Sequence, residues 1–341
     1  MIAPTTRYAP RAAELEPPDR PAARFVVHKQ IMGGRFRFRS SHEALLDLVE
    51  AAYGGHAPHQ LPAGGPEFDI ELDLSPRRDP VGIEPPPVRT QLGAGRVLGF
   101  MDDDNYVLIS PQQRRARVVA SEDMLGHAYH LRYELIEFAV FILATRGQRL
   151  VPLHAACLGG GGRGLLLLGA SGSGKSTLAL HGLLQGLEFL AEDAVFVQPD
   201  SMLATGVASY LHVQADALDT IDDMAARRWI ASSPVIHRRS GVAKFEVDLR
   251  RAPAPARLAQ QPLQLVGAVM VSNQRADDPG ALLTRLVGDD IAARLRADQP
   301  YAKGQPGWHG FERRMVHLGM HELRRGRHPR SSVDALRQLL G

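Results

Sequence analysis

Residues Gly169-Ala170-Ser171-Gly172-Ser173-Gly174-Lys175-Ser176-Thr177 form the most specific motif of this 341-residue chain. They fit the pattern of a phosphate-binding loop in full, in which glycines let successive backbone N–H groups turn toward one anion. The apolar run Leu165-Leu166-Leu167-Leu168 precedes the motif, and a helical pattern from Lys175 to Gln185 follows it. This order of strand, loop and helix predicts an α/β layer structure with an anion site at the helix N-terminus.

The residue types of the loop predict a bound nucleoside triphosphate, for which we expect ATP. All nine residues from Gly169 to Thr177 are expected to contact it. Lys175 supplies a mobile positive charge for the terminal phosphates, and the Ser176 hydroxyl is a hard oxygen ligand of the kind that Mg²⁺ prefers. The motif therefore implies ATP and Mg²⁺, but not what happens to the phosphate.

Two acids follow the next predicted strand. Leu187 to Leu190 reads as this strand, with Ala194 to Val197 as its extension, and Glu192-Asp193 lies between them. Acids at the carboxyl end of a strand beside a phosphate loop lie where ligands bind in open α/β sheets. We expect one acid to hold magnesium, with Asp193 and Ser176 as the ligands, and the other to accept a proton from an attacking hydroxyl.

The segment resembles the catalytic domain of HPr kinase/phosphorylase. The resemblance rests on His154, the loop with Lys175, and the element Gly186 to Asp193. It covers residues 150–200 closely and 150–341 loosely. It implies a phosphate-loop α/β domain akin to the phosphoenolpyruvate carboxykinase core, transfer of phosphate from ATP to a protein serine, and a catalytic role for His154, Lys175 and the paired acids.

This chain departs from that family in three ways. The first acid is an aspartate in the family and is Glu192 here, so either Glu192 or Asp193 is a candidate base. No later Glu-Ile-Arg-Gly-type segment is present, so phosphorylase activity is not expected. The N-terminal region does not match the bifunctional regulators. The chain therefore resembles the kinase branch that modifies a serine on peptide precursors, as in lasso-peptide pathways.

Changes in pattern along the chain predict four parts. Residues 1–24, rich in Pro and charge, read as a flexible tail, and residues 25–120 read as a smaller β-rich α+β domain, a candidate acceptor-recognition module. Residues 121–149 have helical periodicity and predict a connecting helix that begins at Ser121. Residues 150–341 are then the phosphate-loop kinase domain. Two domains agree with a prior of about 150 residues each.

Composition excludes several classes of protein. A net charge of +3 is too small to argue for a nucleic-acid partner. The single cysteine, Cys157, excludes an internal disulfide framework and reads as a small buried apolar residue. No apolar run reaches the roughly 18 residues of a membrane span. We expect a cytoplasmic protein whose partner is a serine-bearing protein or peptide, and the oligomeric state stays open.

Three polar segments outside the motif admit two interpretations each. The turn Asp102-Asp103-Asp104-Asn105 is interpreted as a solvated hairpin turn rather than a cation site. Arg238-Arg239 is interpreted as the protected edge of a strand, whereas Lys244 is a candidate cation for the transferring phosphoryl group. Residues 312–330 carry six arginines and are interpreted as a solvated or peptide-docking face.

Two other functions remain open from the sequence. The first is the same phosphoryl transfer to a small-molecule hydroxyl. The second is a nucleotide-gated ATP-binding assembly protein that hydrolyses ATP slowly. The sequence contains no separate run of four apolar residues followed by Asp-Glu. This absence counts against a motor-type ATPase.

Overall fold

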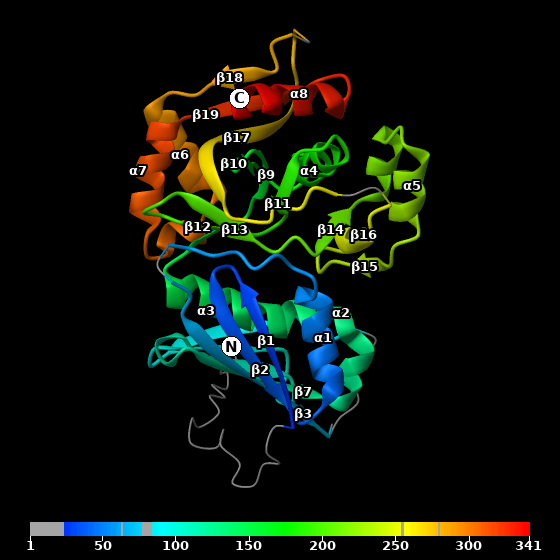
Figure 1. Ribbon diagram of the computed structural model, residues 1–341, viewed down its shortest axis with the longest axis vertical. Helices are drawn as coiled ribbons and strands as arrows, with labels where there is room; N and C mark the ends of the chain where they lie inside the picture. The colour runs from blue at the N-terminus through cyan, green and yellow to red at the C-terminus, as the bar shows by residue number, and fades with distance from the viewer. Residues whose placement is uncertain (1–23, 63, 77–83, 254–255, 279) are drawn as a thin grey trace, which may run out of the picture.

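The computed structural model describes residues 24–62, 64–76, 84–253, 256–278 and 280–341. The expected tail lies outside these residues except for Arg24. The described chain is a mixed α/β protein with one seven-stranded, one nine-stranded and one three-stranded sheet. Figure 1 shows two layers, with the N-terminal strands and α1 to α3 below and the phosphate-loop region above. No described helix is both long and apolar enough to span a bilayer.

The N-terminal layer is built on the seven-stranded sheet, with the order β1-β2-β3-β7-β6-β5-β4. In this sheet β2 and β3 are parallel, as are β3 and β7, and the other neighbours are antiparallel. Its strands are β1 (Phe25–Ile31), β2 (Gly34–Ser40), β3 (Glu67–Ser75), β4 (Arg89–Gly93), β5 (Arg96–Phe100), β6 (Tyr106–Ser110) and β7 (Arg115–Ser121). The sequence predicted all of these except β4, whose five residues are all exposed.

Alternation along the strands separates the two faces of this sheet. Phe36, Phe38 and Ile70 are buried in one core with α1 (Glu43–Tyr53), because successive residues of a strand point to opposite faces. The opposite face carries cross-strand ion pairs such as Arg39 with Asp69 at 2.8 Å. The helices therefore cover only the face that is turned toward the upper layer (Figure 1).

The connecting segment is helical but not one regular α-helix. It runs through a 3₁₀ segment (Glu122–His127), α2 (Ala128–His130), a π-helix (Leu131–Ile136) and α3 (Glu137–Gln148). Buried residues of α3 share the core of the N-terminal sheet, so the segment belongs to that layer. The wider π turn changes the phase of the helix where Arg132 and Tyr133 lie, and such turns are frequent at functional sites.

The upper layer contains the nine-stranded sheet, with the path β11-β9-β10-β17-β13-β12-β8 and with β19 and β18 added beside β17. Its strands are β8 (Val151–Leu153), β9 (Ala156–Gly160), β10 (Arg163–Leu168), β11 (Glu188–Ala191), β12 (Val195–Gln198), β13 (Leu203–Gly206), β17 (Leu263–Arg275), β18 (Leu283–Arg285) and β19 (Met320–Arg325). Its helices are α4 (Lys175–Leu184), α6 (Gly288–Asp298), α7 (Trp308–Leu318) and α8 (Pro329–Leu340).

The apolar run of β10 is buried on both faces, as the sequence predicted. Leu165 and Leu167 lie in the core that contains α4 and α8, whereas Leu166 and Leu168 lie in the core that contains α6 and α7. Helices on both faces of a sheet require a continuous apolar strand between them, rather than an alternating one. This packing fixes the end of β10, where the phosphate loop begins.

The expectation that residues 194–197 extend the second strand is wrong. β11 pairs with β9, whereas β12 pairs with β13 and β8 in another part of the sheet. The chain turns between them at Glu192-Asp193, where Asp193 has a φ of 72°. β10 and β11 are both antiparallel to β9, so their carboxyl ends meet at one edge. The loop and the acids are thereby brought together.

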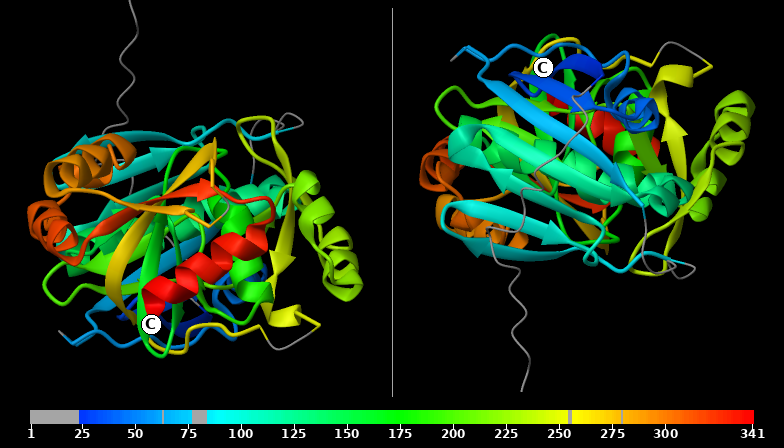
Figure 2. Two further views of the ribbon diagram at one scale, coloured as in Figure 1. Left: turned by 90° about the horizontal axis from the view of Figure 1, so that it is seen from above. Right: turned by 90° about the horizontal axis from the view of Figure 1, so that it is seen from below.

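A small sheet lies beside the large one, with the order β14-β16-β15. Its strands are β14 (Tyr210–Val213), β15 (Val235–His237) and β16 (Ala243–Asp248), and α5 (Met224–Ala231) accompanies them. Seen from above and below, α5 lies on one side of the molecule and α6 and α7 lie on the other (Figure 2). The turn between β15 and β16 carries Arg238.

Candidate functional site

The phosphate loop has the backbone that its glycines predict. Gly172 and Gly174 have φ values of 77° and 99°, a region that residues with a side chain rarely adopt. The Ser173 hydroxyl is buried and has no hydrogen-bond partner. Lys175 lies back over the loop, where its Nζ donates to the carbonyl of Gly169 and, at 3.1 Å, to that of Ala170. An incoming anion can take the place of these carbonyls.

Ser176 joins the loop to the acid pair. Its hydroxyl donates a hydrogen bond to Glu192 Oε1, and the second carboxylate oxygen, Oε2, is buried without a hydrogen-bond partner. The sequence paired Ser176 with Asp193 as metal ligands, but here Glu192 is the acid in contact with Ser176. A hydroxyl beside an unsatisfied carboxylate oxygen suits Mg²⁺, which takes few side-chain ligands when phosphates and water supply the rest. The described residues hold no cluster of three or more His, Cys, Asp or Glu side chains able to bind a metal alone.

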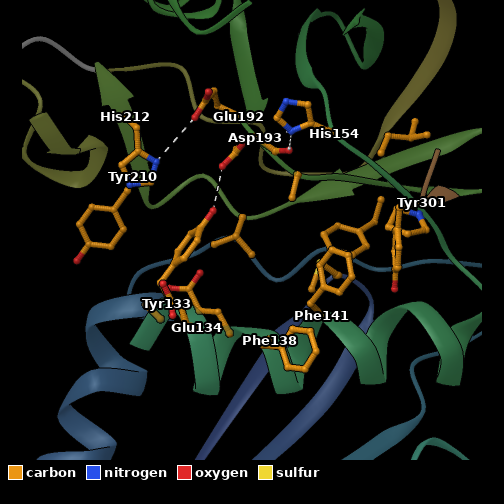
Figure 3. A pocket seen from close by; sticks show the side chains of 18 of the residues that line it. Tyr133, Glu134, Phe138, Phe141, His154, Glu192, Asp193, Tyr210, His212 and Tyr301 are labelled. Carbon is orange, nitrogen blue, oxygen red and sulfur yellow. Dashed lines mark hydrogen bonds and ion pairs between the residues drawn. The ribbon is translucent and has the colours of Figure 1, made fainter. Parts of the chain in front are cut away.

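Asp193 is held by three groups from different parts of the chain. Tyr133 Oη donates to Oδ2 at 2.9 Å, Arg238 Nη2 donates to the same oxygen at 2.7 Å, and His154 Nδ1 lies 3.1 Å from Oδ1. Figure 3 shows Tyr133 rising from the helical layer toward Asp193, with His154 on the other side of the carboxylate. Asp193 is thus fixed in orientation and keeps part of its hydrogen-bonding capacity, since a carboxylate accepts about four hydrogen bonds.

These contacts shift the pKa values of Asp193 and His154 in opposite directions. Burial alone would raise the pKa of Asp193, but the hydrogen bond with His154 and the charge of Arg238 outweigh it and lower that pKa well below its usual range. The hydrogen bond with Asp193 raises the pKa of His154 above 6.5, against the effect of burial. Asp193 is therefore ionised at neutral pH.

Tyr133 and Arg238 are site residues that sequence reasoning missed. Arg238 was interpreted as a strand-edge residue, yet its guanidinium bonds Asp193 and, at 3.0 Å, the Tyr133 hydroxyl. The signal for Tyr133 was the polar triplet Arg132-Tyr133-Glu134 in an otherwise apolar helical pattern. No local pattern predicts which distant group such residues meet.

A buried row of polar side chains leads from the acid pair to the helical layer. His212 Nδ1 lies 4.0 Å from Glu192 Oε2, and His212 Nε2 lies 3.5 Å from Glu246 Oε1. Glu246 pairs with Arg132, whose Nε is 3.7 Å from Glu137. Burial raises the pKa of Glu137 to about 7. No local sequence pattern predicts this row either, since its members are far apart in the chain.

Two cavities meet at the acids. The phosphate cavity, of about 870 Å³, contains the loop, and its wall includes Lys244, Arg275, Arg324, Arg325 and Arg327. The interlayer cavity, of about 800 Å³, lies between α3 and β12. The residues that line both are Tyr133, Glu134, His154, Glu192 and Asp193. A group bound in either cavity therefore reaches the same carboxylates.

The other polar segments singled out in the sequence lie in different parts of the structure. Arg239 binds Glu134 at 2.8 Å and anchors the β15–β16 turn to the N-terminal layer. Asp102 and Asn105 bond one another inside the predicted hairpin turn at 2.9 Å. The basic segment 312–330 is divided, because Arg324, Arg325 and Arg327 line the phosphate cavity, whereas Arg313 and Arg314 do not. Cys157 is fully buried in β9.

Comparison with known proteins shows a distant similarity to solved structures. No protein-family model matches the chain, and no curated protein matches its sequence. Among solved structures, the Hpr(Ser) kinase/phosphatase from Coxiella burnetii is similar over 55% of this chain and 94% of its own, with 11% sequence identity and a TM-score of 0.31.

Proposed function

We propose that the protein is an ATP- and Mg²⁺-dependent kinase that transfers the γ-phosphoryl group to a hydroxyl, with a serine of a protein or peptide as the acceptor. One observation carries the proposal: the Ser176 hydroxyl of the phosphate loop bonds Glu192, while the adjacent Asp193 faces a second cavity. The donor and the acceptor would then meet at the two acids. The serine acceptor follows from the resemblance of the motif to HPr kinase/phosphorylase domains.

The loop and its surroundings would bind the nucleotide. Lys175 would exchange its two carbonyl partners for oxygens of the β- and γ-phosphates, and the loop N–H groups and the dipole of α4 would hold the same phosphates. Arginines in the wall of the phosphate cavity favour a polyanion over a neutral ligand. Ser176 and Glu192 would hold Mg²⁺, which supplies charge neutralisation at the phosphates.

Asp193 would orient the acceptor. Its carboxylate is ionised and fixed by Tyr133, Arg238 and His154, so it can accept a hydrogen bond from the acceptor hydroxyl. The acceptor oxygen would bond to the γ-phosphorus as the bond to the β–γ bridging oxygen breaks, and ADP would leave with that electron pair. The hydroxyl proton would pass to Asp193. Since phosphoryl transfer has a loose transition state, a weak but well-positioned base suffices.

The test is phosphoryl transfer by the purified full-length protein. ATP, Mg²⁺ and serine-containing polypeptides are incubated with the protein, and mass spectrometry locates the phosphate. Lys175→Ala should weaken ATP binding at least tenfold and abolish transfer, whereas Lys303→Ala, at an exposed lysine outside both cavities, should change neither. Transfer that is unchanged in Lys175→Ala would refute the site.

A further inference from the structure

The interlayer cavity has an aromatic wall built from three parts of the chain. Phe141 of α3 lies 5.2 Å from Phe196 of β12 and 6.1 Å from Tyr301, as measured between ring centroids. Figure 3 places Phe138, Phe141 and Tyr301 at the end of the cavity away from His212 and Tyr210. The two layers thus share one apolar surface beside the acids.

Phe196 of this wall is buried, at 3% exposed, but the other aromatic side chains are not fully covered by the protein. Phe138 and Phe141 pack against the N-terminal core but stay half-buried, and Tyr301 is 48% exposed. Apolar surface that faces water inside a hollow favours an apolar ligand by about 25 cal/mol for each Å² covered. A volume of about 800 Å³ suits a ligand of drug size or a few amino-acid side chains, for which pockets measure about 300–1,000 Å³.

The charges of the two cavities differ in sign. Arginines surround the phosphate cavity, whereas Arg132 is the sole Lys or Arg among the described residues that line the interlayer cavity. Arg132 already pairs with Glu246 and Glu137. Asp298 and Glu134 add further carboxylates to the lining. The interlayer cavity should therefore repel an anionic acceptor, whereas the phosphate cavity attracts the nucleotide.

We propose that the interlayer cavity is the acceptor site and that it selects a hydroxyl carried on an uncharged, apolar body. This inference rests on the proposed function and names the class of its acceptor. The hydroxyl lies at Asp193, and the apolar body extends along Phe138, Phe141 and Tyr301. Two sources share this chemistry: a serine flanked by bulky apolar residues in a peptide, and a small aromatic alcohol.

The first experiment compares acceptors with the wild-type protein and MgATP. Three peptides differ only in the two residues that flank one serine. These residues are leucine and phenylalanine in the apolar peptide, two glycines in the glycine peptide and two glutamates in the glutamate peptide. The small-alcohol probe is 2-phenylethanol. We expect kcat/KM at least tenfold higher for the apolar peptide or the alcohol than for the glycine peptide, with the glutamate peptide lowest. Transfer to the alcohol but not to the apolar peptide identifies the small-molecule source. Equal kcat/KM for all three peptides, with no transfer to the alcohol, overturns the inference.

The second experiment changes the cavity and leaves the acids alone. Val207→Phe narrows it and Phe141→Ala removes part of its aromatic wall. Leu92→Phe is the matched control, since Leu92 lies on β4 outside both cavities and is 69% exposed. Both cavity variants should raise the KM of the preferred acceptor at least tenfold and leave the ATP Kd within twofold of wild type. The control should leave both the KM and the ATP Kd within twofold of wild type. Two variants are used because Val207→Phe adds volume inside the cavity, whereas Phe141→Ala removes it.

The failures of the two proposals can be told apart. If the folded wild-type protein neither binds ATP nor transfers phosphate, the proposed function fails. If it binds ATP and phosphorylates an acceptor, but folded Val207→Phe and Phe141→Ala keep the wild-type KM, only the acceptor site is wrong. Melting temperatures within a few degrees of wild type establish that each variant is folded.

Discussion

Tyr133 of the helical layer donates a 2.9 Å hydrogen bond to Asp193 of the sheet layer, although 60 residues separate them in the chain. The same hydroxyl accepts a hydrogen bond from Arg238. Tyr133 is therefore a junction between the two layers and the acid pair. Its position links the orientation of Asp193 to the packing of the N-terminal layer on the sheet.

Replacing Tyr133 by Phe should slow transfer without weakening nucleotide binding. The variant keeps the ring, which stacks on Tyr129 at 5.5 Å, and loses one donor to Asp193. We expect kcat to fall about tenfold, which corresponds to about 1.4 kcal/mol of transition-state stabilisation. The ATP Kd should stay within twofold. Initial-rate kinetics and isothermal titration calorimetry separate the two quantities.

Tyr106→Phe is the control for this prediction, because it removes a tyrosine hydroxyl from β6, outside both cavities, and leaves the three contacts of Asp193 in place. It should keep most of the wild-type kcat. An equal loss of rate in both variants would show that Tyr133 acts through general packing instead of through Asp193.

The His154–Asp193 pair should make stability depend on pH. The pKa of His154 is raised in the folded protein, so its contribution is fully present below the unfolded value of 6.5 and is lost as the pH rises through the raised folded value. Urea denaturation of wild type and His154→Gln between pH 5 and 9 should therefore show a difference in unfolding free energy that shrinks as the pH rises. The exposed-histidine variant His317→Gln should run parallel to wild type. A difference that grows with pH would contradict this assignment.

The backbone at Asp193 predicts an order among its substitutions. With φ at 72°, asparagine is tolerated, whereas alanine costs about 1–2 kcal/mol more. Asp193→Asn and Asp193→Ala should both lose transfer, since neither has a carboxylate. In urea denaturation Asp193→Ala should be the less stable of the two. Equal stability would mean that the left-handed turn relaxes in the variants.

Removing Arg132 from the buried row of polar side chains should greatly lower the free energy of unfolding. Arg132 is 4% exposed and pairs with Glu246 and Glu137. Arg132→Met should destabilise the protein by about 3–5 kcal/mol, because it leaves buried carboxylates without their cation. Chemical denaturation measures the loss, and the double variant with Glu246→Gln should recover part of it.

Arg337→Met provides the comparison, since Arg337 forms a surface ion pair with Asp334 and is 42% exposed. Surface pairs contribute about 1 kcal/mol at most. A cost for Arg132→Met no greater than that of Arg337→Met would mean that the carboxylates are protonated or hydrated when the arginine is absent.

The sequence predicted the parts of the fold that local pattern determines. The run Leu165–Leu168 and the helix from Lys175 follow from apolar periodicity and from the loop between them, and both lie where they were expected. The division between β11 and β12 was missed, because two short apolar strands around Glu192-Asp193 read equally well as one strand. Pairing partners, rather than propensity, decide such cases.

Only the part of the candidate site that lies close together in the sequence could be predicted. Glu192 and Asp193 were candidates because they follow a strand beside the loop, and His154 was a candidate only through the family resemblance. Tyr133 and Arg238 reach Asp193 across 60 and 45 residues of chain. Contacts at that separation depend on how the small sheet and the helical layer pack against the large sheet. The sequence left open which of Glu192 and Asp193 is the base for the same reason, since they differ by contacts with distant groups: Ser176 with Glu192, and Tyr133 and Arg238 with Asp193.

The burial of Cys157, the single cysteine of the chain, has a practical consequence for spectroscopy. A thiol introduced at an exposed position of α1 and another on α7 would react with maleimide dyes while the native sulfur, enclosed in β9, stays unlabelled under native conditions. Energy transfer between such dyes would report whether the spacing of the layers changes when nucleotide and acceptor bind, with no need for a cysteine-free background.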